Sequence, residues 1–273
     1  MKLKKTKLGK LVLWYREDDK YIGQRIALDK YEKYETAIML RQLNLNSVVV
    51  DVGANIGYYT LQMALKTNKV YAIEPDKECF EILKKNVKEN NLKNVVLINK
   101  AASDKKEKKF LVRDEKNQGN SKIQSTPNPS FNKEGDTNKR DLIMAETLDN
   151  ILINEQKISL IKIDTQGFEP KVIEGARKII KRDEPTLFLE YSPSEYLDNK
   201  MINFLKSIYQ NIWSINDFAT VPWPIYKGIK VYGPGYCDLF LKKKINLIDY
   251  GVMMKNINYQ KWIKGIMNLI CQK

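Results

Sequence analysis

The sequence contains no histidine and only three cysteines, Cys79, Cys237 and Cys271. Without histidine, the chain lacks the side chain that most often serves as a general base near neutral pH. The cysteines are odd in number, lie far apart and form no Cys-x-x-Cys pair, so they indicate neither a disulfide framework nor a zinc cluster. Such sparse use of cysteine fits a reducing compartment, and we expect a cytoplasmic protein.

The chain also lacks a long apolar segment. No run reaches the ~18 apolar residues of a membrane-spanning helix. Its basic start, Met1–Lys10, is followed by an apolar run, Leu11–Tyr15, that is too short for a signal peptide. The sequence therefore predicts no transmembrane segment, and it leaves a peripheral contact with a membrane surface open.

Positive charge is in excess. Lys and Arg together number 47 and Asp and Glu 33, so the net charge is +14. An anionic partner such as nucleic acid, an acidic glycan or a membrane surface would account for this charge. A composition rich in lysine throughout would account for it as well. The lysine runs at 2–10, 105–109 and 242–244 carry no pattern of stacking aromatic residues, so a nucleic-acid site is not favoured.

The most informative segment reads Val-Val-Val-Asp-Val-Gly-Ala-Asn-Ile-Gly, from Val48 to Gly57. Three β-branched residues predict a buried strand, and the glycines predict a tight turn before a helix. A strand, a glycine turn and a helix form a unit that cradles nucleotide-like ligands. A dinucleotide fingerprint is disfavoured, because Asn55 and Tyr58 occupy its second and third glycine positions. A P-loop is excluded, because no glycine here precedes Lys-Ser or Lys-Thr in the required frame.

The pattern Asp-x-Gly-x-Asn-x-Gly resembles the first motif of S-adenosylmethionine-dependent methyltransferases. A carboxylate at a strand end suits the cationic end of this cofactor. We therefore expect contacts to S-adenosyl-L-methionine from this segment, namely from Asp51, Gly53, Asn55, Gly57 and Tyr58. A glycine turn that only packs a strand against a helix is the alternative.

Two further segments extend the expected cofactor site. The run Val70–Ile73 predicts a second strand that ends at Glu74 and Pro75, and Glu74 has the spacing of an acid that accepts both ribose hydroxyls. A third strand at 95–99 is followed by Ala102 and Asp104, which we expect at the edge of an adenine pocket. Asp104 either binds the adenine amino group or caps a turn.

A wider resemblance follows from these motifs. The stretches that carry it are Asp51–Gly57, Ile73–Pro75, Thr147–Asp149, Ile161–Glu169, Glu174–Ala176 and Leu187–Glu190. In this order they resemble the FkbM family of methyltransferases over about residues 30–195. The resemblance implies a seven-stranded methyltransferase fold and methylation of hydroxyl oxygens of sugars or polyketides. The family usually has Val-Glu-Gly where this chain has Thr165-Gln166-Gly167, so any role that needs an anion at position 166 is in doubt.

The order of predicted elements gives an α/β fold: a seven-stranded class I methyltransferase (Rossmann-like) sheet with helices on both faces. We expect a hairpin of 11–15 with 21–27 and a helix over 33–43 as an N-terminal extension, residues 1–45. The methyltransferase domain spans 46–245 and includes strands at 211–216 and 238–242, with the last strand antiparallel. Residues 246–273 form a C-terminal helical tail.

The candidate catalytic residues end neighbouring strands. Asp164 ends the fourth strand and Glu190 the fifth, and ligands of open α/β sheets bind beyond these ends. Lys162 points to the same side as Asp164, two residues earlier. Because histidine is absent, a carboxylate, a lysine, a tyrosine or a metal-bound species must accept the proton of an acceptor hydroxyl. We expect Asp164 first and Glu190 second as the base, or both as ligands of a divalent metal ion.

The polar stretch Arg113–Asp141 has no apolar period. We interpret it as a lid over the acceptor, with Asn117 and Asn120 as polar contacts beside Gln166; a disordered insertion is the alternative. The chain has no Asn-Pro-Pro-Tyr and no Pro-Cys, which disfavours methylation of base amino groups and of cytosine carbon. The prediction is an O-methyltransferase acting on a sugar hydroxyl of a glycan or small metabolite. RNA ribose 2′-O methylation is the runner-up, and a non-catalytic cofactor-binding module comes third.

Overall fold

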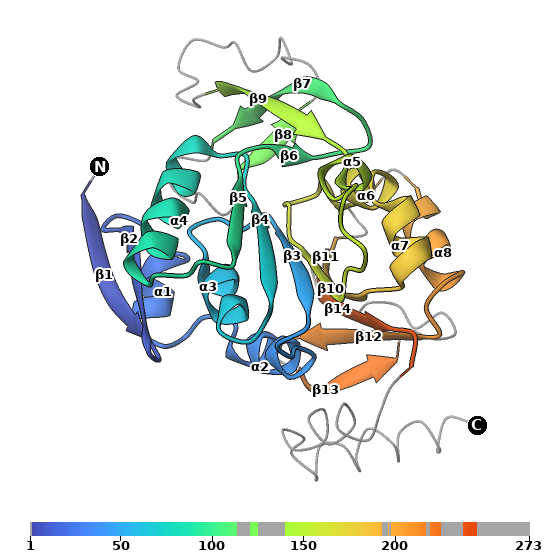
Figure 1. Ribbon diagram of the computed structural model, residues 1–273, viewed down its shortest axis with the longest axis horizontal. Helices are drawn as coiled ribbons and strands as arrows, with labels where there is room; N and C mark the ends of the chain where they lie inside the picture. Colours follow the sequence, from blue (N-terminus) through green and yellow to red (C-terminus); the bar gives the residue numbers. More distant parts are fainter. Residues whose placement is uncertain are drawn as a thin grey trace.

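The computed structural model describes residues 2–113, 121–124, 140–192, 196, 198–216, 219–224 and 237–244 (Figure 1). The predicted acceptor contacts Asn117 and Asn120 and the predicted helical tail 246–273 lie outside these residues. In the part of the chain that is described, no helix is both long enough and apolar enough to span a membrane.

The central sheet is built on apolar strands, and those at its middle, residues 48–52 and 160–163, are almost fully buried on both faces. Its parallel strands are β3 (Val48–Val52), β4 (Lys69–Ile73), β5 (Val95–Ile98), β10 (Leu160–Ile163) and β11 (Thr186–Tyr191). The antiparallel strand β14 (Cys237–Lys242) pairs with β11, and β12 (Asn211–Asn216) and β13 (Ala219–Pro224) complete the order β13-β12-β14-β11-β10-β3-β4-β5. The predicted seven-stranded sheet with an antiparallel last strand is confirmed, and β13 adds an eighth strand at one edge.

Helices cover both faces of this sheet, as predicted. On one side α3 (Tyr58–Ala64) and α4 (Lys77–Glu89) pack with the N-terminal elements, and on the other lie α5 (Leu148–Ile151), α6 (Glu169–Glu174), α7 (Arg177–Asp183) and α8 (Lys200–Lys206) (Figure 1). Successive strand residues point to opposite faces, so Val49 belongs to the first hydrophobic cluster and Val50 to the second.

The N-terminal hairpin differs from the prediction. It joins β1 (Leu3–Leu8) to β2 (Leu11–Arg16) through a turn in which Gly9 has a φ of 60°, a conformation that glycine adopts without strain. The predicted partner segment instead forms the helix α1 (Gly23–Ala27). The cause is Asp19, whose carboxylate accepts hydrogen bonds from the backbone N–H groups of residues 21, 22 and 23 and so starts a helix.

The rest of the N-terminal segment packs on the sheet. The predicted helix over 33–43 is α2 (Lys33–Arg41). Asn86 and Asn90 of α4 hydrogen-bond the backbone of β2, and Leu13 and Ile38 lie in the same buried cluster as Leu61 of α3. The division of the chain at residues 45 and 245 stays a prediction, although residues 2–45 share this core.

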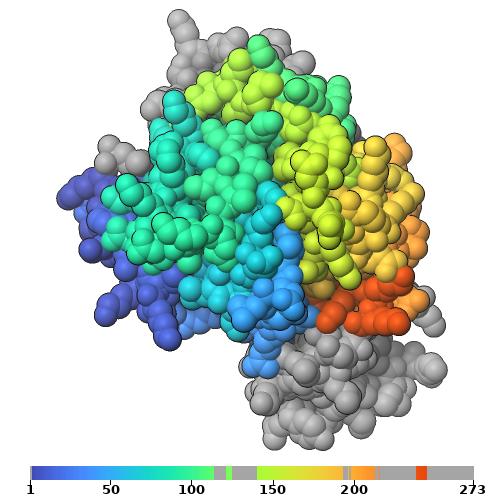
Figure 2. All heavy atoms as spheres, in the orientation of Figure 1, coloured from blue at the N-terminus to red at the C-terminus, as the bar shows by residue number. Residues whose placement is uncertain are grey.

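A second, four-stranded sheet lies beyond β5. Its order is β6 (Ala101–Ala102), β9 (Arg140–Glu146), β7 (Glu107–Val112) and β8 (Lys122–Gln124). In the space-filling view its residues continue the surface of the main domain without a break (Figure 2). In the stretch predicted to be a lid, 113–141, residues 122–124 and 140–141 are strand residues that pair with β7, so these parts are not an irregular loop; the role of the stretch over an acceptor stays a prediction.

Candidate functional site

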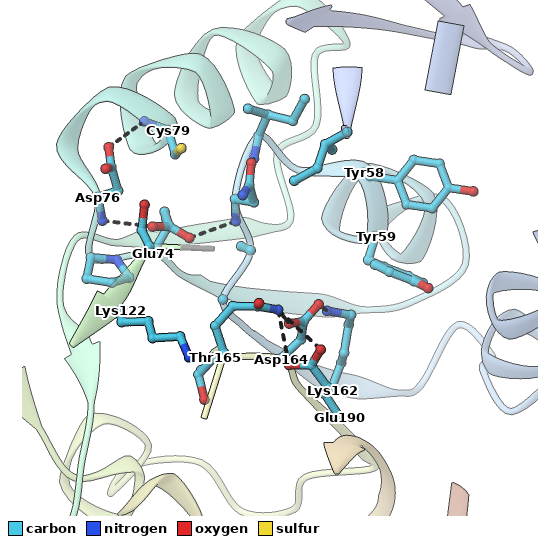
Figure 3. Close-up of a pocket in the computed structure, with 18 of the residues that line it drawn as sticks. Tyr58, Tyr59, Glu74, Asp76, Cys79, Lys122, Lys162, Asp164, Thr165 and Glu190 are labelled. Carbon is cyan, nitrogen blue, oxygen red and sulfur yellow. Dashed lines mark hydrogen bonds and ion pairs between the residues drawn. The ribbon is translucent and has the colours of Figure 1, made fainter. Parts of the chain in front are cut away.

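A cavity of about 540 Å³ opens at the carboxyl ends of β3, β4, β10 and β11. Ligands of open α/β sheets bind at this edge. Figure 3 shows its two ends: Glu74 and Asp76 on one side, and Asp164, Lys162 and Glu190 on the other. Residues of the small sheet and its approach also line the cavity: Leu111, which the sequence did not single out, and Ser121, Lys122 and Ile123, which lie in the stretch predicted to be a lid.

The glycine turn after β3 lets two strand ends approach closely. Gly53 has a φ of 80°, and a Cβ atom there would lie 1.8 Å from the carbonyl oxygen of Asp164. Gly53, Asn55 and Tyr58 line the cavity, as predicted for cofactor contacts. Gly57 does not line it. Gly57 immediately precedes α3 with a φ of 97°, and a Cβ atom there would lie 2.7 Å from the side chain of Leu83. The backbone conformation and the packing at this position therefore both favour glycine.

Glu74 presents a carboxylate that the backbone holds in place. One oxygen, Oε2, accepts a hydrogen bond from the N–H of Asn55 at 2.8 Å, and the other, Oε1, from the N–H of Asp76 at 2.7 Å. Burial raises the pKa of Glu74 to about 8, against the opposing effect of these two hydrogen bonds. Each oxygen keeps a further lone pair, so the group can accept hydrogen bonds from two neighbouring hydroxyls. Pro75, which follows it, also lines the cavity.

Asp51 lies behind this turn. It is 0% exposed, and its Oδ2 accepts a hydrogen bond from Thr60 Oγ1 at 2.6 Å. It is not among the residues that line the cavity, and its Oδ1 has no hydrogen-bond partner among the described residues. The structure thus gives Asp51 a contact that joins β3 to α3 and lends no direct support to its predicted contact with a cofactor.

Ala102 and Asp104 are likewise absent from the cavity wall. Ala102 is buried because β6 pairs with β9, and Asp104 forms an ion pair with Lys171 at 2.7 Å on the surface. Leu111 and Ile123, which pair across β7 and β8, contribute apolar side chains to the cavity wall. Their proximity depends on long-range pairing, so local sequence patterns could not reveal it.

At the other end of the cavity, four predicted residues converge. Lys162 Nζ lies 3.1 Å from Asp164 Oδ2. The side-chain amide of Gln166 donates to Asp164 Oδ1 at 3.0 Å and to Glu190 Oε1 and Oε2 at 3.2 and 3.1 Å. Gln166 reaches both acids from a backbone φ of 56°. The predicted proximity of the acids that end β10 and β11 is therefore observed, and Gln166 bridges them.

The charges at this end fix which groups can accept a proton. Although burial disfavours the charge on Lys162, the carboxylates of Asp164, Asp51 and Glu32 raise its pKa above its ordinary value. Lys162 therefore stays protonated and is unsuited to act as a base. Burial also opposes ionisation of Asp164, but Lys162 and Gln166 hold the pKa of Asp164 below its usual value. Burial and the charge of Asp164 raise the pKa of Glu190, so the pair carries one negative charge near neutral pH.

Residues that the sequence did not single out complete this end. Tyr31, Glu32, Tyr59 and Asp238 line it. The hydroxyl of Tyr59 donates to Glu32 Oε2 at 2.7 Å, and the ring of Tyr59 lies 4.7 Å from Lys162 Nζ. In the antiparallel pairing of β14 with β11, the backbone of Asp238 lies opposite that of Glu190. The antiparallel insertion of β14 brings Asp238 here, and only the three-dimensional pairing reveals it.

The donor set does not fit a divalent metal ion. Asp164 and Glu190 are bridged by the Gln166 amide, and the Lys162 ammonium occupies the other oxygen of Asp164. No group of three or more His, Cys, Asp or Glu side chains within the described ranges is arranged to hold a metal. A cation-binding role for Asp164 and Glu190 is therefore unsupported. By contrast, Glu74 with its apolar neighbours fits the ribose diol and purine of S-adenosylmethionine.

Comparisons with known proteins indicate the family of the chain. The family model described as the methyltransferase FkbM domain matches residues 51–211. A crystal structure of Methyltransferase FkbM from Methylobacillus flagellatus KT matches with a TM-score of 0.45 and 20% identity, covering 71% of this chain and 43% of that one.

Two curated relatives match shorter stretches. Over 85 residues the chain is 34% identical to a Sulfurisphaera tokodaii protein named "Probable cobalt-precorrin-6B C(15)-methyltransferase (decarboxylating)". The matched stretch covers 30% of this chain and 44% of that protein. Over 57 residues it is 46% identical to a tRNA(Phe) (4-demethylwyosine(37)-C(7)) aminocarboxypropyltransferase of Methanocaldococcus jannaschii, covering 20% and 23%. The chain spans less than half the length of each of these proteins.

Proposed function

The chain belongs to the FkbM family of S-adenosylmethionine-dependent methyltransferases, and from this premise we propose that it methylates a hydroxyl oxygen of a sugar. The observation that carries the proposal is the division of one cavity into two ends. One end offers Glu74 to a diol, and the other offers Asp164 and Glu190 to an acceptor hydroxyl. Such an arrangement suits transfer of a group between two molecules bound side by side.

The end of the cavity that contains Glu74, the cofactor end, would bind the cofactor and orient it. Glu74 would accept hydrogen bonds from the ribose hydroxyls, Leu111 and Ile123 would cover the purine, and the turn at Gly53 and Asn55 would lie along the rest of the molecule. When bound, S-adenosylmethionine supplies an electrophilic methyl carbon on a positively charged sulfur. The close approach of Gly53 to Asp164 supports this placement, because it brings the two ends of the cavity into contact.

At the acceptor end, Asp164 would take the hydroxyl proton. A hydroxyl proton becomes strongly acidic as its oxygen is methylated, so Asp164 would accept it during the transfer. A carboxylate with a lowered pKa is therefore a sufficient base. Lys162 would hold Asp164 in its ionised form, and Gln166 would fix the distance between Asp164 and Glu190.

A neutral sugar suits this end better than a phosphate-bearing acceptor. Four carboxyl groups line it, those of Glu32, Asp164, Glu190 and Asp238, and the cavity wall also carries the ammonium groups of Lys162 and Lys122. Carboxylates accept hydrogen bonds from sugar hydroxyls and repel phosphates. The rings of Tyr31, Tyr58 and Tyr59 form edge-to-face contacts at 5.0 and 5.1 Å and offer an apolar wall to a sugar ring. We also propose a cytoplasmic location, supported by the sparse cysteines.

Methylation of an RNA ribose 2′-hydroxyl is the second candidate. The net charge of +14 favours it, and so does the local similarity to an enzyme whose name specifies tRNA. Its weakness is the negative charge at the acceptor end, where phosphates flanking a ribose would approach Asp164 and Asp238.

The test is transfer of a labelled methyl group from S-adenosylmethionine to a panel of free sugars, nucleotide sugars, glycans and RNA. Asp164→Asn should abolish most of the transfer, whereas the matched variant Asp104→Asn, outside the cavity, should retain it. Label in sugars supports the proposal. Label in RNA alone, or no label in any acceptor with a folded protein that binds the cofactor, overturns it.

A further inference from the structure

Arg113 joins three elements at the cofactor end of the cavity. It is 7% exposed and follows the last residue of β7. Its guanidinium forms ion pairs with Asp76 Oδ2 at 2.8 Å, Glu78 Oε1 at 2.6 Å and Asp141 Oδ2 at 2.7 Å. Asp76 and Glu78 belong to the start of α4, and Asp141 belongs to β9. One buried cation thus ties the small sheet to the main domain.

Asp76 connects Arg113 to Glu74, because it contacts both residues. The N–H of Asp76 donates to Glu74 Oε1 at 2.7 Å, and the Oδ1 of Asp76 accepts from the N–H groups of Glu78 and Cys79, which begin α4. Arg113 also supplies the positive charge that faces Asp76, the acid next to Glu74. Without it, Asp76 and Glu74 would be two buried acids, each raising the free energy of the other's ionised form.

The small sheet, on its other side, delivers the apolar cover. Leu111 lies two residues before Arg113 on β7 and pairs with Ile123 on β8, and both line the cavity. Because Arg113 fixes the end of β7 against the start of α4, it also restrains where Leu111 and Ile123 stand in the wall of the cavity that Glu74 lines. A planar guanidinium with several donors in fixed directions suits this three-way contact better than a lysine would.

We propose that Arg113 is a positioning residue for the nucleoside half of the cofactor: it sets Glu74 and the Leu111–Ile123 cover at the spacing that a ribose and a purine require. This inference rests on the proposed function, because it presumes that a nucleoside-bearing cofactor binds at Glu74. It assigns the small sheet to cofactor binding, in place of the predicted role of this region as an acceptor lid.

Calorimetry with S-adenosylhomocysteine tests the proposal. Arg113→Gln should weaken binding by about tenfold or more, since one partner of a buried ion-pair network is lost. Arg113→Lys should recover part of the loss. Asp141→Asn, which loosens the same contact from β9, should weaken binding less, and the double variant should show non-additive losses. Arg182→Gln, which removes an ion pair far from the cavity, is the matched control and should bind as the wild type does.

The thermal midpoint of each variant separates positioning from general stability. All titrations run well below the midpoint, where a merely structural residue would leave the affinity of the folded protein unchanged. If Arg113→Gln does not fold, Arg113→Lys and Asp141→Asn decide: both must bind more weakly than Arg182→Gln. Wild-type affinity in the folded Arg113 and Asp141 variants would overturn the inference alone. Failure of the folded wild type to bind would instead overturn the proposed function.

Discussion

The two ends of the cavity hold their carboxylates in different ways. At the cofactor end, both oxygens of Glu74 accept hydrogen bonds from backbone N–H groups. At the acceptor end, Asp164 and Glu190 are held by the side chains of Lys162 and Gln166. The position of a carboxylate that backbone N–H groups hold depends on the fold. The position of one that side chains hold depends on single residues, which a substitution can change. We infer that the first end is fixed for one cofactor and that substitutions can retune the second for different acceptors.

Substitution of Asp164 gives the sharpest test of whether the two ends of the cavity have separate roles. If the acceptor end carries the chemistry, Asp164→Asn should lower kcat by roughly 10²–10⁴-fold, because it removes the proton acceptor. S-adenosylhomocysteine should bind the variant with unchanged affinity, because no backbone contact at Glu74 is altered. Steady-state kinetics and calorimetry on the same preparation measure both values. A large loss of cofactor affinity in this variant would show that the two ends are not separate.

Glu74→Gln tests the other end. The amide cannot accept from both backbone N–H groups and two hydroxyls, so affinity for S-adenosylhomocysteine should fall roughly 10- to 100-fold. In the wild type, affinity should rise as the pH increases through about 8, the pKa of Glu74, because ribose hydroxyls bind the ionised form better. Titrations between pH 6.5 and 9 in both proteins would detect this rise. An equal pH dependence in the variant would assign it to another group.

Gln166→Glu restores the residue that the family usually carries. The change places a third carboxyl group against Asp164 and Glu190, and like charges in a buried site repel. We expect the thermal midpoint at pH 8 to fall by about 2–8 °C, with a smaller fall at pH 5, where the added group is protonated. Differential scanning calorimetry measures both. An unchanged midpoint together with activation by Mg²⁺ would mean that this end is a cation site, contrary to our interpretation of Lys162.

Glu190→Gln should have the smallest effect, and it should stabilise the protein. Burial and Asp164 raise the pKa of Glu190 above its ordinary value of 4.5, so the folded state binds this proton more tightly than the unfolded state. The resulting stability is complete below pH 4.5 and is lost as the pH rises toward the folded-state pKa. Glutamine avoids that loss, so the midpoint should rise by about 2–4 °C at pH 8 and hardly at pH 4.5. A fall at pH 8 would show that Glu190 is ionised in the folded protein.

The sequence allowed much of the fold and part of the site to be predicted. Local signals placed the turn at Gly53, the acid Glu74 and the strand ends at Asp164, because each lies inside a single strand–turn–helix unit. The hairpin was misplaced because Gly9 and Asp19 act through turn and helix-start geometry that hydrophobic periodicity does not capture.

The rest of the site depends on contacts between different elements of the fold. Asp51 follows the motif but lies behind the cavity wall, since Thr60 binds it from α3. Leu111, Ile123 and Arg113 reach the cofactor end only through the pairing of the small sheet, and Asp238 reaches Glu190 only through β14. No periodicity in one segment carries that information.

The most direct test of the central claim is a calorimetric titration of the wild type, Glu74→Gln and Asp164→Asn with S-adenosylhomocysteine at pH 8. We expect micromolar binding by the wild type and by Asp164→Asn, and binding at least about tenfold weaker by Glu74→Gln. Equal affinities in all three folded proteins, or no binding by the wild type, would contradict it.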